Sequence, residues 1–162
     1  LFQIDGINGK RLLLKIIREN ELFGETAAYD GKPAPIAVEA RSALVTDFVP
    51  TGHMELLRTQ FASIDRALAT VATQNLRATL AAIEELMLLD LRERAIACLK
   101  RLSAEFRQPT DTSVRIDVTQ SELASMLGAS RQATNKVLSE FEKAGWLKRN
   151  FRYFIWMPSR IH

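Results

Sequence analysis

Residues 118–138 read VTQSELASMLGASRQATNKVL. Thr119 and Glu122 have the spacing of a capping box, in which two side chains bind the first backbone N–H groups of a helix. Apolar residues then recur at helical spacing and give that helix one apolar face. Gly128 follows directly, where a helix that ends in the left-handed region favours glycine. The stretch therefore predicts a short helix that begins at Thr119 and ends in a tight glycine turn.

A second helix is predicted to begin at Ser130, because a serine hydroxyl is a good N-cap. The side chains expected to face inward are Ala133, Val137, Leu138 and Phe141, and those on the opposite face are Arg131, Gln132, Asn135 and Lys136. Arginine binds guanine bidentately, glutamine and asparagine suit adenine, and lysine reaches guanine or a phosphate. Such a pair of helices indicates a helix-turn-helix, whose second helix fits the DNA major groove. The alternative is an ordinary helical hairpin with a solvated charged face.

The flanking residues favour a winged form of this motif. Residues 114–118 alternate apolar and polar side chains, which is typical of a short strand. Gly145 should end the second helix, and the aromatic-rich stretch behind it predicts a hairpin that turns near Asn150. Basic side chains near the hairpin tip would lie close to DNA phosphates, namely Lys148, Arg149 and Arg152. Thr119 and Ser130, at the two helix starts, are expected at the DNA as well. The alternative for the hairpin tip is a solvated charged turn.

The charge of the 162-residue chain is unevenly distributed around a net value of +3. Residues 91–162 hold 13 Lys and Arg against 7 Asp and Glu, or +6, whereas residues 1–90 hold 9 against 12, or −3. A basic half that contains the helix-turn-helix matches the electrostatic footprint of a DNA-binding domain joined to another part.

Several function classes are disfavoured. No segment of the sequence is long and apolar enough to span a membrane. The single Cys98 cannot build a metal site, and we predict that it lies in the core. We find no nucleophile–base pairing, metal-ligand spacing or glycine-rich phosphate loop, so the chain is not expected to be an enzyme.

Residues 1–50 are predicted to be rich in β-structure. Apolar runs at residues 10–17, 36–40 and 43–49 resemble strands, and residues 1–6 read as the tail of a strand entering a turn. Turn signals separate the runs, at Asp5-Gly6, Asn8-Gly9, Asp30-Gly31 and the pair Pro33 and Pro35. Short strands with regular turns favour a barrel or sandwich.

From about Gly52 to Arg107 the pattern becomes helical. A long helix is expected from about Ser63 to Leu89, with Asp90 as the cap of the next helix and a hinge between the two. A long helix with an apolar stripe usually packs on a partner, and helix-turn-helix proteins commonly dimerise. We therefore expect a homodimer; packing within one chain is the alternative. The predicted interface comprises Ile64, Leu68, Val71, Leu76, Leu80 and Ile83.

Three stretches resemble the family of the cAMP receptor protein and the fumarate-nitrate regulator (CRP/FNR). Residues 22–25 (LFGE) resemble the phosphate-cassette signature of its cyclic-nucleotide fold, residues 88–94 (LLDLRER) its hinge, and residues 129–138 its recognition helix. The resemblance covers essentially the whole chain. It implies a bacterial, cytoplasmic, homodimeric transcription regulator that binds double-stranded DNA, with RNA polymerase as a further partner and a small-molecule effector.

The fold implied is α+β. Residues 1–62 would form part of a β-roll sensor domain similar to a cyclic-nucleotide-binding domain, residues 63–89 the dimerisation helix, and residues 90–162 a winged helix-turn-helix domain. Leu1 is not a start residue, and the resemblance implies that the first strands of the sensor domain precede it.

The predicted effector pocket departs from the cAMP-binding members of the family. The pocket residues are expected to be Gly24, Glu25 and Thr79, with Glu25 in the place of a ribose-binding carboxylate or as a structural residue of the turn. The Arg-Ser pair that holds the cyclic phosphate aligns with Pro35 and Ile36, neither of which pairs with a phosphate. The cofactor stays unknown: an iron–sulfur cluster, a haem or another small effector are all open.

The recognition helix departs as well. The family commonly has Arg-Glu at Arg131 and Gln132, and Arg at Lys136. Glutamine both donates and accepts, which suits adenine, so we expect Arg131 to read a guanine and Gln132 to change the half-site. The sequence thus predicts a sequence-specific DNA-binding regulator. The alternative is a small-ligand sensor whose winged helix mediates protein contacts.

Overall fold

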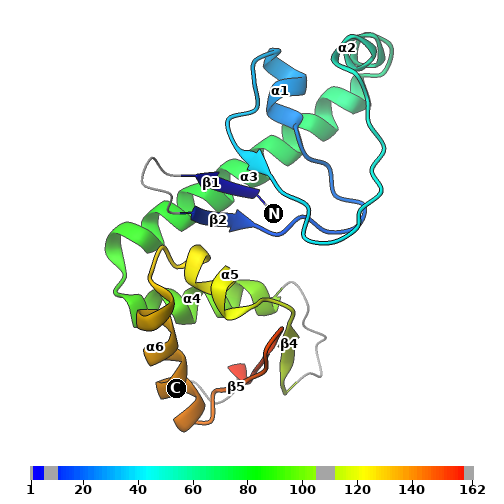
Figure 1. Ribbon diagram of the computed structural model, residues 1–162. Coiled ribbons are helices and arrows are strands. Elements are labelled where there is room, and N and C mark those ends of the chain that lie inside the picture. The colour runs from blue at the N-terminus through cyan, green and yellow to red at the C-terminus, as the bar shows by residue number, and fades with distance from the viewer. Residues whose placement is uncertain (1, 6–10, 105–111, 159–162) are drawn as a thin grey trace. The chain divides into compact units, whose positions relative to one another are not determined.

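The computed structural model describes residues 2–5, 11–104 and 112–158 (Figure 1). The chain divides into two compact units, residues 1–82 and residues 83–162. The first contains β1 (Phe2–Asp5), β2 (Arg11–Lys15), α1 (Glu25–Asp30), β3 (Ala37–Val38) and α2 (Thr51–Gln60). α3 (Ala62–Leu88) carries the division point. The second contains α4 (Leu91–Ala104), β4 (Val114–Ile116), α5 (Gln120–Met126), α6 (Arg131–Lys143), β5 (Leu147–Arg149) and β6 (Phe154–Trp156). This mixture of helices and small antiparallel sheets confirms the α+β class.

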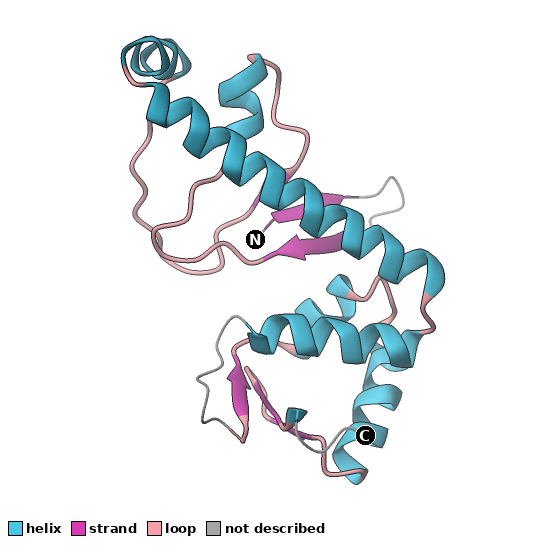
Figure 2. Cartoon of the chain, turned by 180° about the vertical axis from the view of Figure 1, so that it is seen from behind, coloured by secondary structure: helices cyan, strands magenta, loops and turns pink. Residues whose placement is uncertain are grey.

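The first unit is built on an antiparallel sheet with the strand order β2-β1-β3. Leu13 is the buried residue of β2, and its two neighbours in the strand are half-buried. β1 and β2 lie beside α3 in both views (Figures 1 and 2). The predicted strand at residues 10–17 is confirmed as β2, and that at residues 36–40 shortens to β3. The turns predicted at Gly6 and at Asn8-Gly9 lie outside the described residues.

The strand predicted at residues 43–49 is wrong. This segment is irregular and exposed, and no described strand pairs with it. A strand needs a neighbour to satisfy its backbone groups, and β-branched residues alone do not supply one. The short helix α1, which no periodicity had indicated, is a further difference in this unit.

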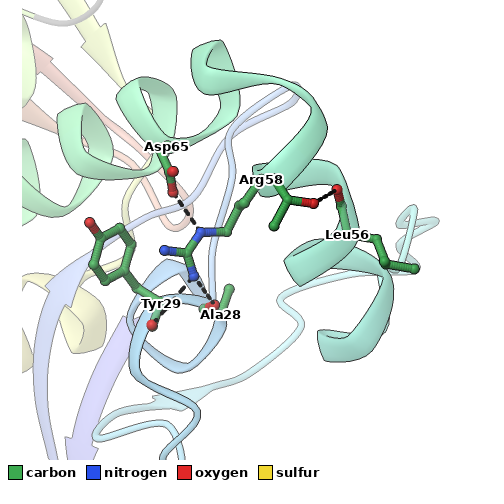
Figure 3. A network of polar contacts seen from close by, with 6 residues as sticks. Ala28, Tyr29, Leu56, Arg58 and Asp65 are labelled. Atoms are coloured by element: carbon green, nitrogen blue, oxygen red, sulfur yellow. Dashed lines mark hydrogen bonds and ion pairs between the residues drawn. The ribbon is translucent and has the colours of Figure 1, made fainter.

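Arg58 joins the helices of the first unit (Figure 3). Its guanidinium on α2 forms an ion pair with Asp65 on α3 and lies 4.4 Å from the ring centre of Tyr29 on α1. The same group donates to the carbonyl oxygens of Ala28 and Tyr29, at 3.5 Å each. Arg58 therefore links α1, α2 and α3 through these contacts, and the hydrogen bond to Asp65 raises the pKa of Arg58.

The helical region is confirmed as far as Ala104, with breaks at Phe61 and between Leu88 and Leu91. Its last three expected positions, residues 105–107, lie outside the described residues. α3 matches the predicted helix of residues 63–89 to within one residue at each end. At the second break, the Asp90 carboxylate accepts from the Glu93 amide (2.8 Å) and the Glu93 carboxylate accepts from the Asp90 amide (3.0 Å). Arg94 donates to the carbonyl oxygens of Leu86 (3.2 Å) and Leu89 (3.4 Å) at the end of α3. Asp90 is therefore the cap that was expected.

The two faces of α3 differ in burial. Leu68 is 3% exposed within its own chain, and Ile64 and Val71 are half-buried. In contrast, Leu80 is 56% and Ile83 is 51% exposed, and Leu76 and Met87 share their side of the helix. The predicted interface must therefore be corrected. Leu68 packs inside the chain, and the large apolar side chains left exposed along this one side of α3 are Leu76, Leu80, Ile83 and Met87.

The second unit has a contiguous core. α4 packs on α6 and β4, and α5 and β5 pack on α6. The antiparallel sheet has the order β4-β6-β5, with Val114 and Leu147 both opposite Trp156. Phe141 lies 5.4 Å from Trp146 and 6.3 Å from Trp156 between ring centres. Other fully or nearly fully buried side chains are Ala95, Cys98, Leu99, Ile116, Leu123, Leu127, Leu138 and Phe154. Cys98 is thus in the core, as predicted.

One inward position of α6 was assigned to the wrong residue. Thr134 is buried, whereas Ala133 is half-buried. Val137, Leu138 and Phe141 are buried as expected. The Thr134 hydroxyl has no hydrogen-bond partner in the described part of the chain. A buried hydroxyl in that condition is destabilising.

We expect Thr134→Val to raise the free energy of unfolding of this unit by about 1 kcal/mol, since valine keeps the shape and removes the unpaired hydroxyl. Both tryptophans of the chain lie in this unit, so urea unfolding followed by tryptophan fluorescence reports on it. Thr112→Val is the control, because Thr112 is exposed in the same unit. Lower stability of the Thr134 variant would contradict the prediction.

Candidate DNA interface and effector pocket

The helix-turn-helix is set by local caps, as predicted. Thr119 accepts the Glu122 amide proton at 3.2 Å, and the Glu122 carboxylate accepts from the Thr119 amide at 2.7 Å. α5 is therefore closed by a reciprocal capping box. Gly128 has a φ of 59°, in the left-handed region. Ser130 then caps α6 by accepting from the Ala133 amide at 3.1 Å.

The outer face of α6 carries all four side chains predicted to read bases. Each is exposed in the structure: Arg131, Gln132, Asn135 and Lys136. The inner face is fixed by Val137, Leu138 and Phe141 in the core. Because this inner face packs against the core, α6 has a fixed position in its unit and presents its polar side chains on a rigid support.

The hairpin behind α6 is also confirmed. β5 pairs with β6, and the turn closes through the Asn150 amide, which donates to the Tyr153 carbonyl at 2.9 Å. Lys148 and Arg152 are exposed near the tip. The wing and the outer face of α6 thus present their exposed cations from the same unit.

Arg149 differs from the other wing cations because its guanidinium is bound by the protein. Its Nε and Nη2 donate to one carboxylate oxygen of Glu142 at 2.8 and 2.6 Å, and its Nη1 donates to Oδ1 of Asn135 at 2.6 Å. The hydrogen bond from Arg149 lowers the pKa of Glu142. Sequence reasoning placed Arg149 at a phosphate; the structure instead joins it to α6. Arg149 is 7 residues from Glu142 and 14 residues from Asn135, so no pattern in a short stretch of sequence indicates these contacts.

The first unit contains a cavity of about 320 Å³. It brings together the predicted pocket residues Gly24, Glu25 and Thr79 with Pro35 and Ile36. The walls are mostly apolar, and no arginine is among the described lining residues. No described group of His, Cys, Asp and Glu side chains is arranged to hold a metal ion.

Glu25 is the polar centre of this cavity and is only 5% exposed. Its Oε1 accepts from Nδ2 of Asn75 at 2.8 Å, and its Oε2 is buried with no partner in the part of the chain that the structure describes. Thr79 donates its hydroxyl proton to the Asn75 carbonyl at 2.9 Å, so its oxygen keeps lone pairs to accept with. The sequence did not indicate Asn75 as a pocket residue, because it lies 50 residues from Glu25 and no short motif contains both.

The second unit is thus a winged helix-turn-helix, and the first contains a mostly apolar cavity. Residues 86–160 match the model of the Crp-like helix-turn-helix domain. A CRP-like cAMP-activated global transcriptional regulator of Mycobacterium tuberculosis is 30% identical over 146 residues, which are 87% of this chain and 64% of that protein. The transcriptional regulator SdrP of Thermus thermophilus is 26% identical over 88% of this chain and 67% of its own length.

Solved structures agree. A CRP/FNR-family transcriptional regulator of Thermus thermophilus is 25% identical with a TM-score of 0.68, over 96% of this chain and 77% of that one. The c-di-GMP-responsive regulator CLP of Xanthomonas campestris shares the fold, with a TM-score of 0.77 at 18% identity, over 96% and 79% of the two chains. The family model, the relatives and the solved structures together support assignment of this chain to the CRP/FNR family of transcriptional regulators. The relatives are regulators and not enzymes, in agreement with the sequence. This chain spans about two thirds of the length of its curated relatives.

None of the described helices combines the length and the apolar character needed to cross a membrane.

Proposed function

We propose that the protein is a homodimeric, sequence-specific regulator that binds double-stranded DNA. The observation that carries the proposal is the exposed face of α6, which is capped at Ser130 and supported by a buried inner face. An α-helix of this kind fits the major groove. The proposal places the protein in the bacterial cytoplasm, with RNA polymerase as a further partner.

Each exposed side chain has a role in this proposal. Arg131 reads a guanine, Gln132 an adenine, and Lys136 a guanine or a phosphate. Lys148 and Arg152 in the wing, and Thr119 and Ser130 at the helix starts, contact phosphates or sugars and set the register. Since phosphate contacts release counterions, binding is expected to weaken steeply with salt.

Binding-site selection from a random duplex pool tests the proposed function. A two-fold symmetric consensus, with half-site centres about one helical turn apart, is expected. A winged helix that served protein contacts instead would enrich no sequence and would show no steep dependence on salt, and that result would overturn the proposal.

We expect Arg131→Ala to weaken binding to the selected site by about 1–3 kcal/mol while affinity for random DNA changes little, because the lost contact is to a base. Competition binding at constant salt measures the ratio of the affinity for the selected site to the affinity for random DNA. Lys148→Ala is the matched control: a phosphate contact should weaken binding to all sequences alike and make the salt dependence less steep. If Arg131→Ala leaves the ratio of affinities for the selected site and for random DNA unchanged, Arg131 does not contact a base.

The dimer is proposed from α3. Leu76, Leu80, Ile83 and Met87 are separated by four, three and four residues, which is the spacing of a coiled-coil seam. All four are largely exposed in one chain. A second copy of the same helix would cover them and would present two α6 helices to two half-sites.

The cavity around Glu25 is proposed as the effector site. A phosphate there would meet a buried carboxylate and no guanidinium from the described lining residues. Lys15, the cation of the lining, is paired with Glu21 at 3.2 Å. Oxygen acceptors on Glu25 and Thr79 within apolar walls suit a small, largely apolar molecule that donates hydrogen bonds from a hydroxyl or amine group.

We accordingly expect no cAMP binding at millimolar concentration in isothermal titration calorimetry. Restoring the family's anion-binding pair with Pro35→Arg and Ile36→Ser should introduce measurable affinity, because arginine binds phosphate bidentately. The matched control is Pro33→Arg with Val45→Ser, which adds the same groups outside the cavity lining. Micromolar cAMP binding by the unaltered protein would contradict this reading of the pocket.

A further inference from the structure

We propose that Arg149 fixes the side-chain amide of Asn135 so that Asn135 reads a hydrogen-bond acceptor on DNA, namely the N7 and O6 atoms of guanine or O4 of thymine, and not adenine. Arg149 is then a positioning residue, and Asn135 determines specificity. The inference rests on the proposed function, because it requires α6 to lie in the major groove.

The first step is the orientation of the amide. Nη1 of Arg149 lies 2.6 Å from Oδ1 of Asn135. The two ends of an asparagine amide look alike in shape, but a guanidinium only donates hydrogen bonds, so the end facing it must be the oxygen. Nδ2, with its two hydrogens, therefore points away from Arg149.

The second step is the rigidity of Arg149. Two of its nitrogens bind one oxygen of Glu142, and its backbone amide donates to the other oxygen at 3.2 Å. Glu142 lies seven residues after Asn135, two turns further along the same side of α6. The hydrogen bond from Arg149 lowers the pKa of Glu142, so the pairing favours the charged form of the carboxylate. The Arg149 guanidinium is thus fixed by its place on β5 and by Glu142 on α6, and it in turn fixes the Asn135 amide.

The third step is the chemistry of the base. Asparagine reads adenine bidentately, with its oxygen accepting from the adenine amino group and its nitrogen donating to N7. In this structure the oxygen already accepts a short, charge-assisted hydrogen bond. An adenine amino group at the same oxygen would face the positive charge of Arg149. The amide nitrogen stays available, and its two hydrogens suit the acceptor edge of guanine or O4 of thymine.

Binding-site selection with three variants of the full chain tests the inference. Asn135→Ala should flatten the preference at one base position, and this identifies the position that Asn135 reads. The unaltered protein should select guanine or thymine there. Arg149→Met removes the donor but keeps the bulk, so the amide can turn and adenine should rise at that position by about fivefold or more relative to guanine or thymine. Arg152→Met, an exposed cation of the same wing, should weaken binding without a change in base preference.

The outcomes are distinguishable. Selection of adenine by the unaltered protein at the Asn135 position, or an unchanged preference in Arg149→Met, would overturn the inference and leave the proposed function standing. Enrichment of no sequence by the unaltered protein would overturn both. Arg149→Lys guards against loss of folding, since it keeps a cation near Glu142 without the guanidinium fork and should also relax the preference. Native tryptophan fluorescence and an unchanged unfolding midpoint identify folded variants.

Discussion

Replacing Leu80 and Ile83 by glutamate is expected to make the protein monomeric and to lower its affinity for a two-half-site DNA by roughly 10²–10⁴-fold. Both side chains are more than half exposed in a single chain, and two charges at the seam would be buried without partners in the dimer. Once one recognition helix is bound, the second binds as an intramolecular event, and the dimer gains about this factor from it. Sedimentation equilibrium and titration of a palindromic site measure both effects.

The control must carry the same added negative charge. Ala67 and Gln74 are exposed on a different side of α3, so Ala67→Glu with Gln74→Glu repels DNA equally without altering the seam. This control should remain dimeric and should keep most of the affinity. A dimeric seam variant would show that the partner helix packs elsewhere, and the proposed interface would then be abandoned.

Phe141→Ala is expected to destabilise the winged-helix unit by about 3–5 kcal/mol, which is typical of removing a fully buried aromatic ring. Phe141 is 1% exposed and contacts both tryptophans, which connects α6 to the sheet and to the turn after the helix. A loss of this size is a large share of the stability of an ordinary domain. Urea unfolding followed by tryptophan fluorescence measures it.

Phe151→Ala is the control, since Phe151 lies in the wing turn and is almost fully exposed. Its effect on unfolding should stay within about 0.5 kcal/mol. Equal effects of the two substitutions would mean that Phe141 does not organise the core as described.

The helix-turn-helix was predictable from the sequence because each of its signals acts over a few residues. A capping box is complete within Thr119 and Glu122, and Gly128 and Ser130 need only their immediate neighbours. Burial on α6 follows helical periodicity, but periodicity alone does not show which of two adjacent residues is the more deeply buried. The apolar Ala133 was chosen over Thr134, although the threonine methyl group is also suited to a core position.

The parts that were not predicted depend on distant residues. Residues 43–49 have the composition of a strand, yet no described strand lies beside them. Asn75 is fifty residues from Glu25, and the two meet only because α3 passes the start of α1. The binding of Arg149 to Asn135 likewise requires β5 to return along α6. Such pairings are properties of the tertiary fold and leave no pattern in a short window.

The caps between α3 and α4 have a mechanical consequence. Asp90 and Glu93 satisfy the start of α4 with side chains of their own segment, so this end of the helix does not depend on the position of α3. Arg94 is different, because it reaches back to two carbonyl oxygens at the end of α3. A change in the angle between the helices exchanges those two hydrogen bonds for bonds to water, at a cost of about 1–3 kcal/mol. That energy is of the size by which one bound ligand commonly changes the affinity for another.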